Sequence, residues 1–190
     1  MMATLFTTNQ DVMRKKLIFF FLFTISIFAQ SREQELVRHA ADSIAKARLE
    51  QSSLTPQVLK IEGMSSPKVR HFLNHLCSMP GASYFEVGCW KGSTLVAALY
   101  KNHLAQAVVV DNWSEFGGPK TCFLQNVQQF LPNSSLQVLE GDCFSLERKG
   151  IFSLPVNVYF YDGAHDALSQ ERAFTYFNDV FDEVFIAVEI

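Results

Sequence analysis

The feature that most constrains this chain is an apolar segment that leads through a glycine-containing loop into a helical pattern within a dozen residues. It runs from Tyr84 to Thr94, and its loop contains Gly88 and Gly92. Glycines let a backbone turn sharply and approach a ligand where a Cβ would clash, and Ser93 is suited to cap the helix that follows. A strand, a tight loop and a helix start in this order are typical of a nucleotide-type cofactor site in an α/β fold.

The glycine spacing separates the cofactor classes. Glu86, Gly88 and Gly92 form a Glu-x-Gly-x-x-x-Gly pattern without the third glycine in register that dinucleotide folds use, which disfavours NAD. Lys91 precedes its glycine, whereas a P-loop needs Gly-Lys followed by Ser or Thr, which disfavours ATP. An acid at the strand end would repel phosphate but suits a ligand with an ammonium group. The loop therefore favours a cofactor that carries an amino-acid moiety.

Carboxylates recur where further apolar runs stop. The runs cover residues 107–111, 136–142, 156–162 and 184–189, and their acids are Asp111, Asp142, Asp162 and Glu189. Such runs indicate buried parallel strands, and open α/β sheets bind ligands at the carboxyl ends of their strands. Asp111 follows the glycine loop by roughly 20 residues, where such folds place the acid that binds ribose hydroxyls. We therefore predict an α/β, Rossmann-like three-layer sandwich with a mostly parallel sheet.

Apolar residues at helical spacing predict helices between these strands. Ser66 and Pro67 are expected as N-cap and first turn of one helix. The predicted buried faces comprise Val69, Phe72, Leu73 and Leu76, then Phe123, Val127, Phe130 and Leu131, and finally Phe174, Phe177 and Phe181. We interpret these side chains as core, because alternating strands and helices must pack their faces together.

With these motifs, roughly residues 63–189 resemble the class I S-adenosylmethionine-dependent methyltransferases, and within them the small-molecule O-methyltransferases similar to the catechol and macrocin enzymes. The resemblance implies S-adenosylmethionine as cofactor. The implied cofactor-binding residues are Glu86, Gly88, Gly92 and Ser93 in the loop around the methionine part, Asp111 at the ribose, and Trp113, Asp142 and Cys143 near the adenine, with Trp113 as a stacking surface.

The resemblance also implies methyl transfer to a hydroxyl of a small molecule or sugar. Asp162 and His165, in the run Asp-Gly-Ala-His, would be the catalytic residues, one of them as the base that removes the acceptor proton. A hard cation needs several oxygen ligands, and Asp162 with Glu189 would make a poor magnesium site, so no metal ligands are assigned.

The end of the chain departs from the family pattern. A complete class I sheet has seven strands, whereas this sequence stops at Ile190 as its fifth strand finishes, so we expect a C-terminally truncated domain without the final antiparallel pair. An oligomer or a complementing C-terminal piece would then cover the exposed sheet edge. Two alternatives stay open, namely a non-catalytic remnant and an exported binding protein of the same fold.

The site residues also have structural interpretations that the sequence leaves open. Gly88 and Gly92 would then be simple turn glycines, Asp111 and Asp142 would be loop or cap residues, Trp113 would pack against the sheet, and His165 would be solvated. A histidine acts as a base only within hydrogen-bond reach of the transferred proton, which a sequence does not show.

Residues 1–30 have the layout of a secretory signal peptide or a membrane-associating segment. Arg14-Lys15-Lys16 precedes the apolar run 17–29, which is too short to span a bilayer comfortably. S-adenosylmethionine is made and kept in the cytosol, so we favour a cytoplasmic location, with peripheral membrane contact through this segment or export as alternatives.

Residues 31–62 are predicted as an amphipathic helix followed by a linker, and 63–190 as the methyltransferase-like domain. The expected apolar positions of the helix are Leu36, Val37, Ala40, Ile44 and Ala45. A chain that is 48% hydrophobic with 18 Phe can bury a sizeable core, and a formal charge of -3 gives no reason to expect a nucleic-acid partner. The four cysteines show no metal-ligand spacing, so buried reduced thiols are the default.

Overall fold

A computed structural model describes residues 31–189 and contains a five-stranded parallel sheet with the strand order β3-β2-β1-β4-β5. The strands are β1 (Ser83–Val87), β2 (Gln106–Asp111), β3 (Leu136–Glu140), β4 (Val156–Tyr161) and β5 (Phe181–Glu189). The predicted Rossmann-like α/β fold is confirmed. The signal-peptide interpretation of residues 1–30 lies outside the described residues.

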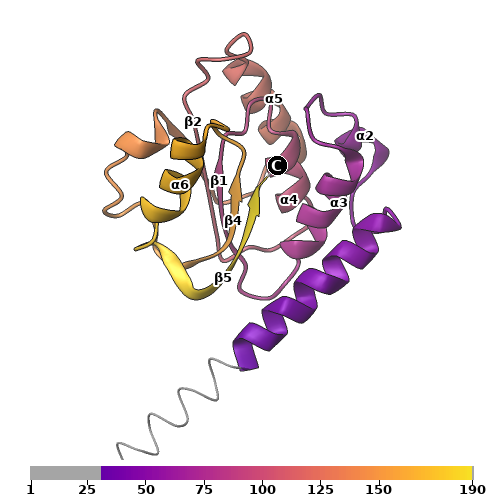
Figure 1. The fold of residues 1–190 in the computed structure, drawn as a ribbon. Coiled ribbons are helices and arrows are strands. Elements are labelled where there is room, and N and C mark those ends of the chain that lie inside the picture. The colour runs from indigo at the N-terminus through magenta and orange to yellow at the C-terminus, as the bar shows by residue number, and fades with distance from the viewer. Residues whose placement is uncertain (1–30, 190) are drawn as a thin grey trace, which may run out of the picture.

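Helices cover both faces of the sheet (Figure 1). They are α2 (Pro56–Leu59), α3 (Pro67–Leu76), α4 (Ser93–Leu99), α5 (Lys120–Phe130) and α6 (Ala167–Thr175), with a 3₁₀ turn η1 (Cys143–Ser145) and a further helical segment over residues 31–48. Side chains alternate between the faces: Tyr84 packs with α3, α4 and α5, whereas its neighbour Phe85 packs with α6. The result is the expected three-layer arrangement.

The central strands are buried on both faces, and β5 differs from them. All residues of β1 and β4 are buried, as expected for parallel strands covered by helices. The residues of β5 are half-buried or exposed, and within residues 31–189 this strand pairs with β4 alone. This strand therefore forms an edge of the described sheet.

Of the two N-caps predicted from the sequence, one is present in the structure and the other is not. Ser66 caps α3 as predicted, since the Val69 amide donates to its Oγ at 3.4 Å. The predicted cap at Ser93 is wrong, because Ser93 is the first residue of α4 and the N-cap is Gly92, which makes no side-chain cap bond. With φ +82°, Gly92 supplies the left-handed turn that glycine adopts freely. Ser93 is buried instead, and a Cβ on Gly63 would lie 1.9 Å from its Oγ.

The helix over residues 31–48 is present, but only part of its predicted buried face is confirmed, namely Leu36 and the partly buried Ala40. Leu36 and Ala47 are buried, whereas Val37 and Ile44 are 63% and 45% exposed. The difference arises because polar contacts to the C-terminal end of α3 orient this helix, and Ser43 is among its buried residues. No helix within residues 31–189 is long and apolar enough to cross a membrane.

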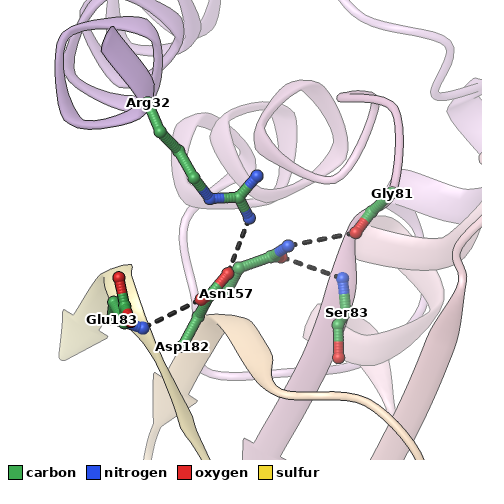
Figure 2. Close-up of polar contacts among 6 residues, drawn as sticks. All are labelled: Arg32, Gly81, Ser83, Asn157, Asp182 and Glu183. Atoms are coloured by element: carbon green, nitrogen blue, oxygen red, sulfur yellow. Dashed lines mark hydrogen bonds and ion pairs between the residues drawn. The ribbon is translucent and has the colours of Figure 1, made fainter. Parts of the chain in front are cut away.

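Polar side chains form hydrogen bonds at the end of the sheet where β1, β4 and β5 begin (Figure 2). Asn157 at the start of β4 donates to the Gly81 carbonyl at 3.0 Å and accepts from the Ser83 amide at 2.9 Å. Arg32 from the N-terminal helical segment donates to the Asp182 carboxylate on β5 at 2.6 Å. These bonds anchor the amino ends of the strands and leave their carboxyl ends to form the candidate site.

Candidate functional site

The glycine loop connects the end of β1 to α4, and both of its glycines have packing reasons. A Cβ on Gly88, whose φ is +80°, would lie 2.1 Å from the Asp162 carbonyl oxygen. A Cβ on Gly92 would lie 3.0 Å from the Phe123 ring on α5. The chain itself therefore requires both glycines, as in the turn-glycine interpretation. Their contact with a cofactor stays a prediction.

Asp111, at the end of β2, holds this loop through its carboxylate. One oxygen, Oδ2, accepts hydrogen bonds from the amides of Cys89 at 2.7 Å and Trp90 at 2.8 Å. The other, Oδ1, accepts from the Trp113 amide at 2.7 Å. The structure thus brings Asp111 to the glycine loop and hydrogen-bonds it to three backbone amides. Its contact with a ribose stays a prediction.

Glu86 lies beneath the loop with no exposed surface. Its carboxyl oxygens accept hydrogen bonds from the hydroxyls of Tyr84 and Thr94, each at 2.6 Å. Burial raises the pKa of Glu86 to about 8; the two hydroxyl donors oppose the rise, and the nearby charges of Asp162 and Asp111 add to it. Glu86 is therefore a buried carboxyl group that is largely protonated at neutral pH.

Asp162 is the third carboxyl group of this end of the sheet. It follows β4, its backbone contacts Gly88, and it is half-buried. Burial raises the pKa of Asp162, His165 opposes the rise and Asp111 adds to it. The exposed His165 has its Nε2 at 3.8 Å from Oδ1 of Asp162, beyond direct hydrogen-bond distance. The two predicted catalytic residues are therefore neighbours, and their catalytic roles stay predictions.

Asp142 and Cys143 follow β3 at the same end of the sheet. The exposed Asp142 caps η1, accepting from the Phe144 amide at 3.0 Å and from the Ser145 hydroxyl at 2.9 Å. Burial, and then the charge of Asp142, raises the pKa of the Cys143 thiol to about 11. Asp142 thus has the cap role that the sequence left open, and its contact with adenine stays a prediction.

Trp113 is placed as a core residue. It is 7% exposed, its ring lies 5.2 Å from that of Phe123, and its Nε1 donates to the Trp90 carbonyl at 2.9 Å. This burial favours the packing interpretation over adenine stacking, which stays a prediction.

Several residues around the site were not singled out from the sequence. Tyr84 lies two positions before Glu86 on the same face of β1, a spacing that a strand pattern could have revealed. Thr94 reaches Glu86 only after the loop has turned, so its role has no local signal. Trp90 and Phe116 both have positive φ, +46° and +48°, and Trp90 Nε1 donates to the Phe116 carbonyl at 3.3 Å. Such strained residues gather at functional sites.

Two other features lie apart from this site. A cavity of about 710 Å³ at the opposite end of the sheet includes Arg148, Pro155, Tyr176 and Phe181 in its lining and none of the predicted site residues. Within residues 31–189, no cluster of three His, Cys, Asp or Glu side chains is arranged to hold a metal ion. The four cysteines are free thiols, and Cys77 and Cys89 are buried.

Comparisons with known proteins reveal likeness at the level of the fold. No protein-family model and no curated protein sequence matches this chain. The SAH-bound methyltransferase PaMTH1 from Podospora anserina is 11% identical, with a TM-score of 0.50 over 99% of this chain and 73% of that chain. Coclaurine N-methyltransferase, bound to N-methylheliamine and SAH, is 12% identical, with a TM-score of 0.46 over 82% of this chain and 50% of that chain. The chain has the Rossmann-like fold of S-adenosylmethionine-dependent methyltransferases.

Proposed function

We propose that this chain binds S-adenosylmethionine at the carboxyl ends of β1, β2 and β4 and transfers its methyl group to a hydroxyl of a small molecule or sugar. The observation that carries the proposal is the convergence of Glu86, Asp111 and Asp162 beside the glycine loop. Their mutual repulsion contributes to the raised pKa values of Glu86 and Asp162. A ligand with positive charge relieves this repulsion. S-adenosylmethionine carries a sulfonium and an ammonium group, and the fold supports the same assignment.

In such a reaction the residues of the site would have separate roles. The bound cofactor supplies an electrophilic methyl group. Glu86, once ionised, attracts the ammonium group of the cofactor electrostatically from beneath the loop. Asp162 accepts the proton of the acceptor hydroxyl, since a carboxylate with a raised pKa is the stronger base. His165, whose Nε2 lies 3.8 Å from Oδ1 of Asp162, is the alternative group to receive the proton. The chain contributes proximity and alignment to the in-line transfer.

Calorimetric titration of S-adenosylhomocysteine into the full chain tests the proposal, because this product needs no acceptor. We expect saturable binding that is tighter than that of 5′-methylthioadenosine, which lacks the amino-acid part. Glu86→Gln removes the charge with little change of shape and should reduce this preference. A folded chain that binds neither compound would overturn the proposal.

The proposal implies a cytosolic location, because S-adenosylmethionine is made and kept there. Detecting the chain with an antibody in the cytosolic, membrane and extracellular fractions of a cell culture tests this location independently of the chemistry. Recovery of the chain outside the cell would contradict it.

A further inference from the structure

The carboxylate of Asp111 has little capacity left for a ligand. An ionised carboxylate offers about four acceptor positions. Oδ2 uses two of them for the amides of Cys89 and Trp90, and Oδ1 uses one for the amide of Trp113. A ribose presents two neighbouring hydroxyls, and one remaining acceptor position serves one of them.

The three amides belong to backbone that needs support. Trp90 and Trp113 have φ values of +46° and +47°, which are unfavourable for side chains of this size. The two segments are further joined by the bond from Trp113 Nε1 to the Trp90 carbonyl at 2.9 Å. Hydrogen bonds to an ionised acceptor are the stronger kind, so Asp111 is suited to hold both loops in these conformations.

Removal of this carboxylate leaves the backbone amides of Cys89, Trp90 and Trp113 without this acceptor. The side chain of Cys89 is buried and the residue of Trp113 is 7% exposed, so water reaches this region poorly. Backbone donors that lose a partner in such surroundings destabilise the local conformation. The glycine loop is therefore expected to depend on Asp111 before any ligand arrives.

We propose that Asp111 is a positioning residue that holds the 88–92 loop against β2, and that it offers the cofactor's ribose a single hydrogen bond at most. The inference rests on the proposed function for the identity of the ligand. It differs from the simpler expectation that Asp111 is chiefly a ribose ligand. Loss of Asp111 then weakens cofactor binding through the shape of the loop.

The first experiment uses the full chain without ligand. Hydrogen exchange of the Cys89, Trp90 and Trp113 amides is measured in the wild type and in Asp111→Ala, and we expect roughly tenfold or faster exchange in the variant from loss of charge-assisted bonds. Asp166→Ala is the matched control, because Asp166 likewise accepts from two amides, of Leu168 and Ser169, at 3.1 and 3.0 Å. The control should leave the three amides unchanged.

Asp111→Asn keeps the size of the side chain and serves if Asp111→Ala does not fold. An amide side chain has one oxygen, so it cannot accept at both carboxylate positions. At least one of the three backbone amides should therefore exchange faster. Unchanged exchange in a folded Asp111 variant would overturn the inference, whatever the protein binds.

The second experiment separates loop support from ribose contact. Affinities for S-adenosylhomocysteine and for its 2′-deoxy and 3′-deoxy analogues are compared between the wild type and the Asp111 variants. We expect each variant to weaken all three ligands by the same factor to within about tenfold, which is the range one hydrogen bond accounts for. A variant that weakens S-adenosylhomocysteine about a hundredfold more than both analogues would overturn the inference. A wild type that binds none of the ligands would refute the proposed function and leave the exchange result standing.

Discussion

The backbone of Asp162 blocks the space beside Gly88, because a Cβ on Gly88 would lie only 2.1 Å from the Asp162 carbonyl oxygen. Both backbones are fixed at this point, since the Gly88 amide donates to the Val110 carbonyl at 2.9 Å and the Asp162 amide donates to the Val87 carbonyl at 2.8 Å. The contact joins the loop after β1 to the loop after β4. It sets the spacing of two candidate site segments without any ligand.

Gly88→Ala should therefore be strongly destabilising. The new methyl group meets backbone that is hydrogen-bonded on both sides, so we expect a loss of unfolding free energy of about 3 kcal/mol or more. Gly81→Ala is the matched control, because Gly81 also has positive φ, +72°, but faces open space. It should lose about 1–2 kcal/mol, from the left-handed backbone alone. Equal losses in urea unfolding of the two variants would contradict the role of the Asp162 contact.

Glu86 should make the stability of the fold depend on pH. Its pKa rises from the ordinary value of 4.5 to about 8 in the fold, so the folded state binds the proton more tightly than the unfolded state. The free energy of unfolding should therefore fall as pH rises from about 4.5 to about 8, and this contribution should be constant outside that window. Glu86→Gln should remove this slope. An unchanged slope in urea unfolding of the variant would show that Glu86 does not hold its proton there.

Cofactor binding should release a proton from Glu86. An ammonium group near this carboxyl lowers its pKa, so affinity for S-adenosylhomocysteine should rise with pH and level off near pH 8, where the free carboxyl has a pKa of about 8. Calorimetry in two buffers with different ionisation enthalpies measures the released proton. 5′-Methylthioadenosine has no ammonium group and is the control that should release none. Proton release that persists in Glu86→Gln would assign it to another group.

The helical segment over residues 31–48 should loosen in acid through His75. Lys46 Nζ lies 2.7 Å from His75 Nε2 and Ser43 Oγ lies 3.0 Å from Nδ1, with His39 and Asp42 also nearby. Burial lowers the pKa of His75, the charges of Lys46 and His39 lower it further, and Asp42 opposes them. Protonation would also give Nε2 a hydrogen that faces the Lys46 ammonium.

Because the pKa of His75 is below its ordinary value in the docked state, the undocked state takes up the proton more readily, and docking should weaken as pH falls below about 6.5. Hydrogen exchange of the segment between pH 7.5 and 5.5 measures this, and His75→Gln should flatten the dependence. His71→Gln is the control, because His71 also has a lowered pKa but bonds to Ser52, outside the segment. A dependence that disappears in the control variant would place the switch at His71.

The sequence predicted some parts of the site and missed others for identifiable reasons. Asp111 and Asp162 were found because the apolar runs of β2 and β4 stop at them, and parallel strands bring such ends to one edge, whereas Glu86 lies inside β1 next to the glycine loop. The cap at Ser66 was found because it depends on the residues next to it. The predicted cap at Ser93 is wrong, because the left-handed Gly92 is the N-cap and Ser93 is buried next to Gly63.

The apolar runs and the glycine spacing by themselves determined a parallel α/β sheet with a glycine loop and several acids at its carboxyl edge. Hydrophobic periodicity and turn chemistry depend on residues that are close together in the chain, so strands, helices and turns can be predicted from the sequence. Only the tertiary structure decided what each acid does: Asp111 holds the amides of Cys89, Trp90 and Trp113, and Glu86 is buried under Thr94. These contacts join residues from separate elements, and which hydrogen-bond partner a carboxylate takes depends on the packing that brings them together.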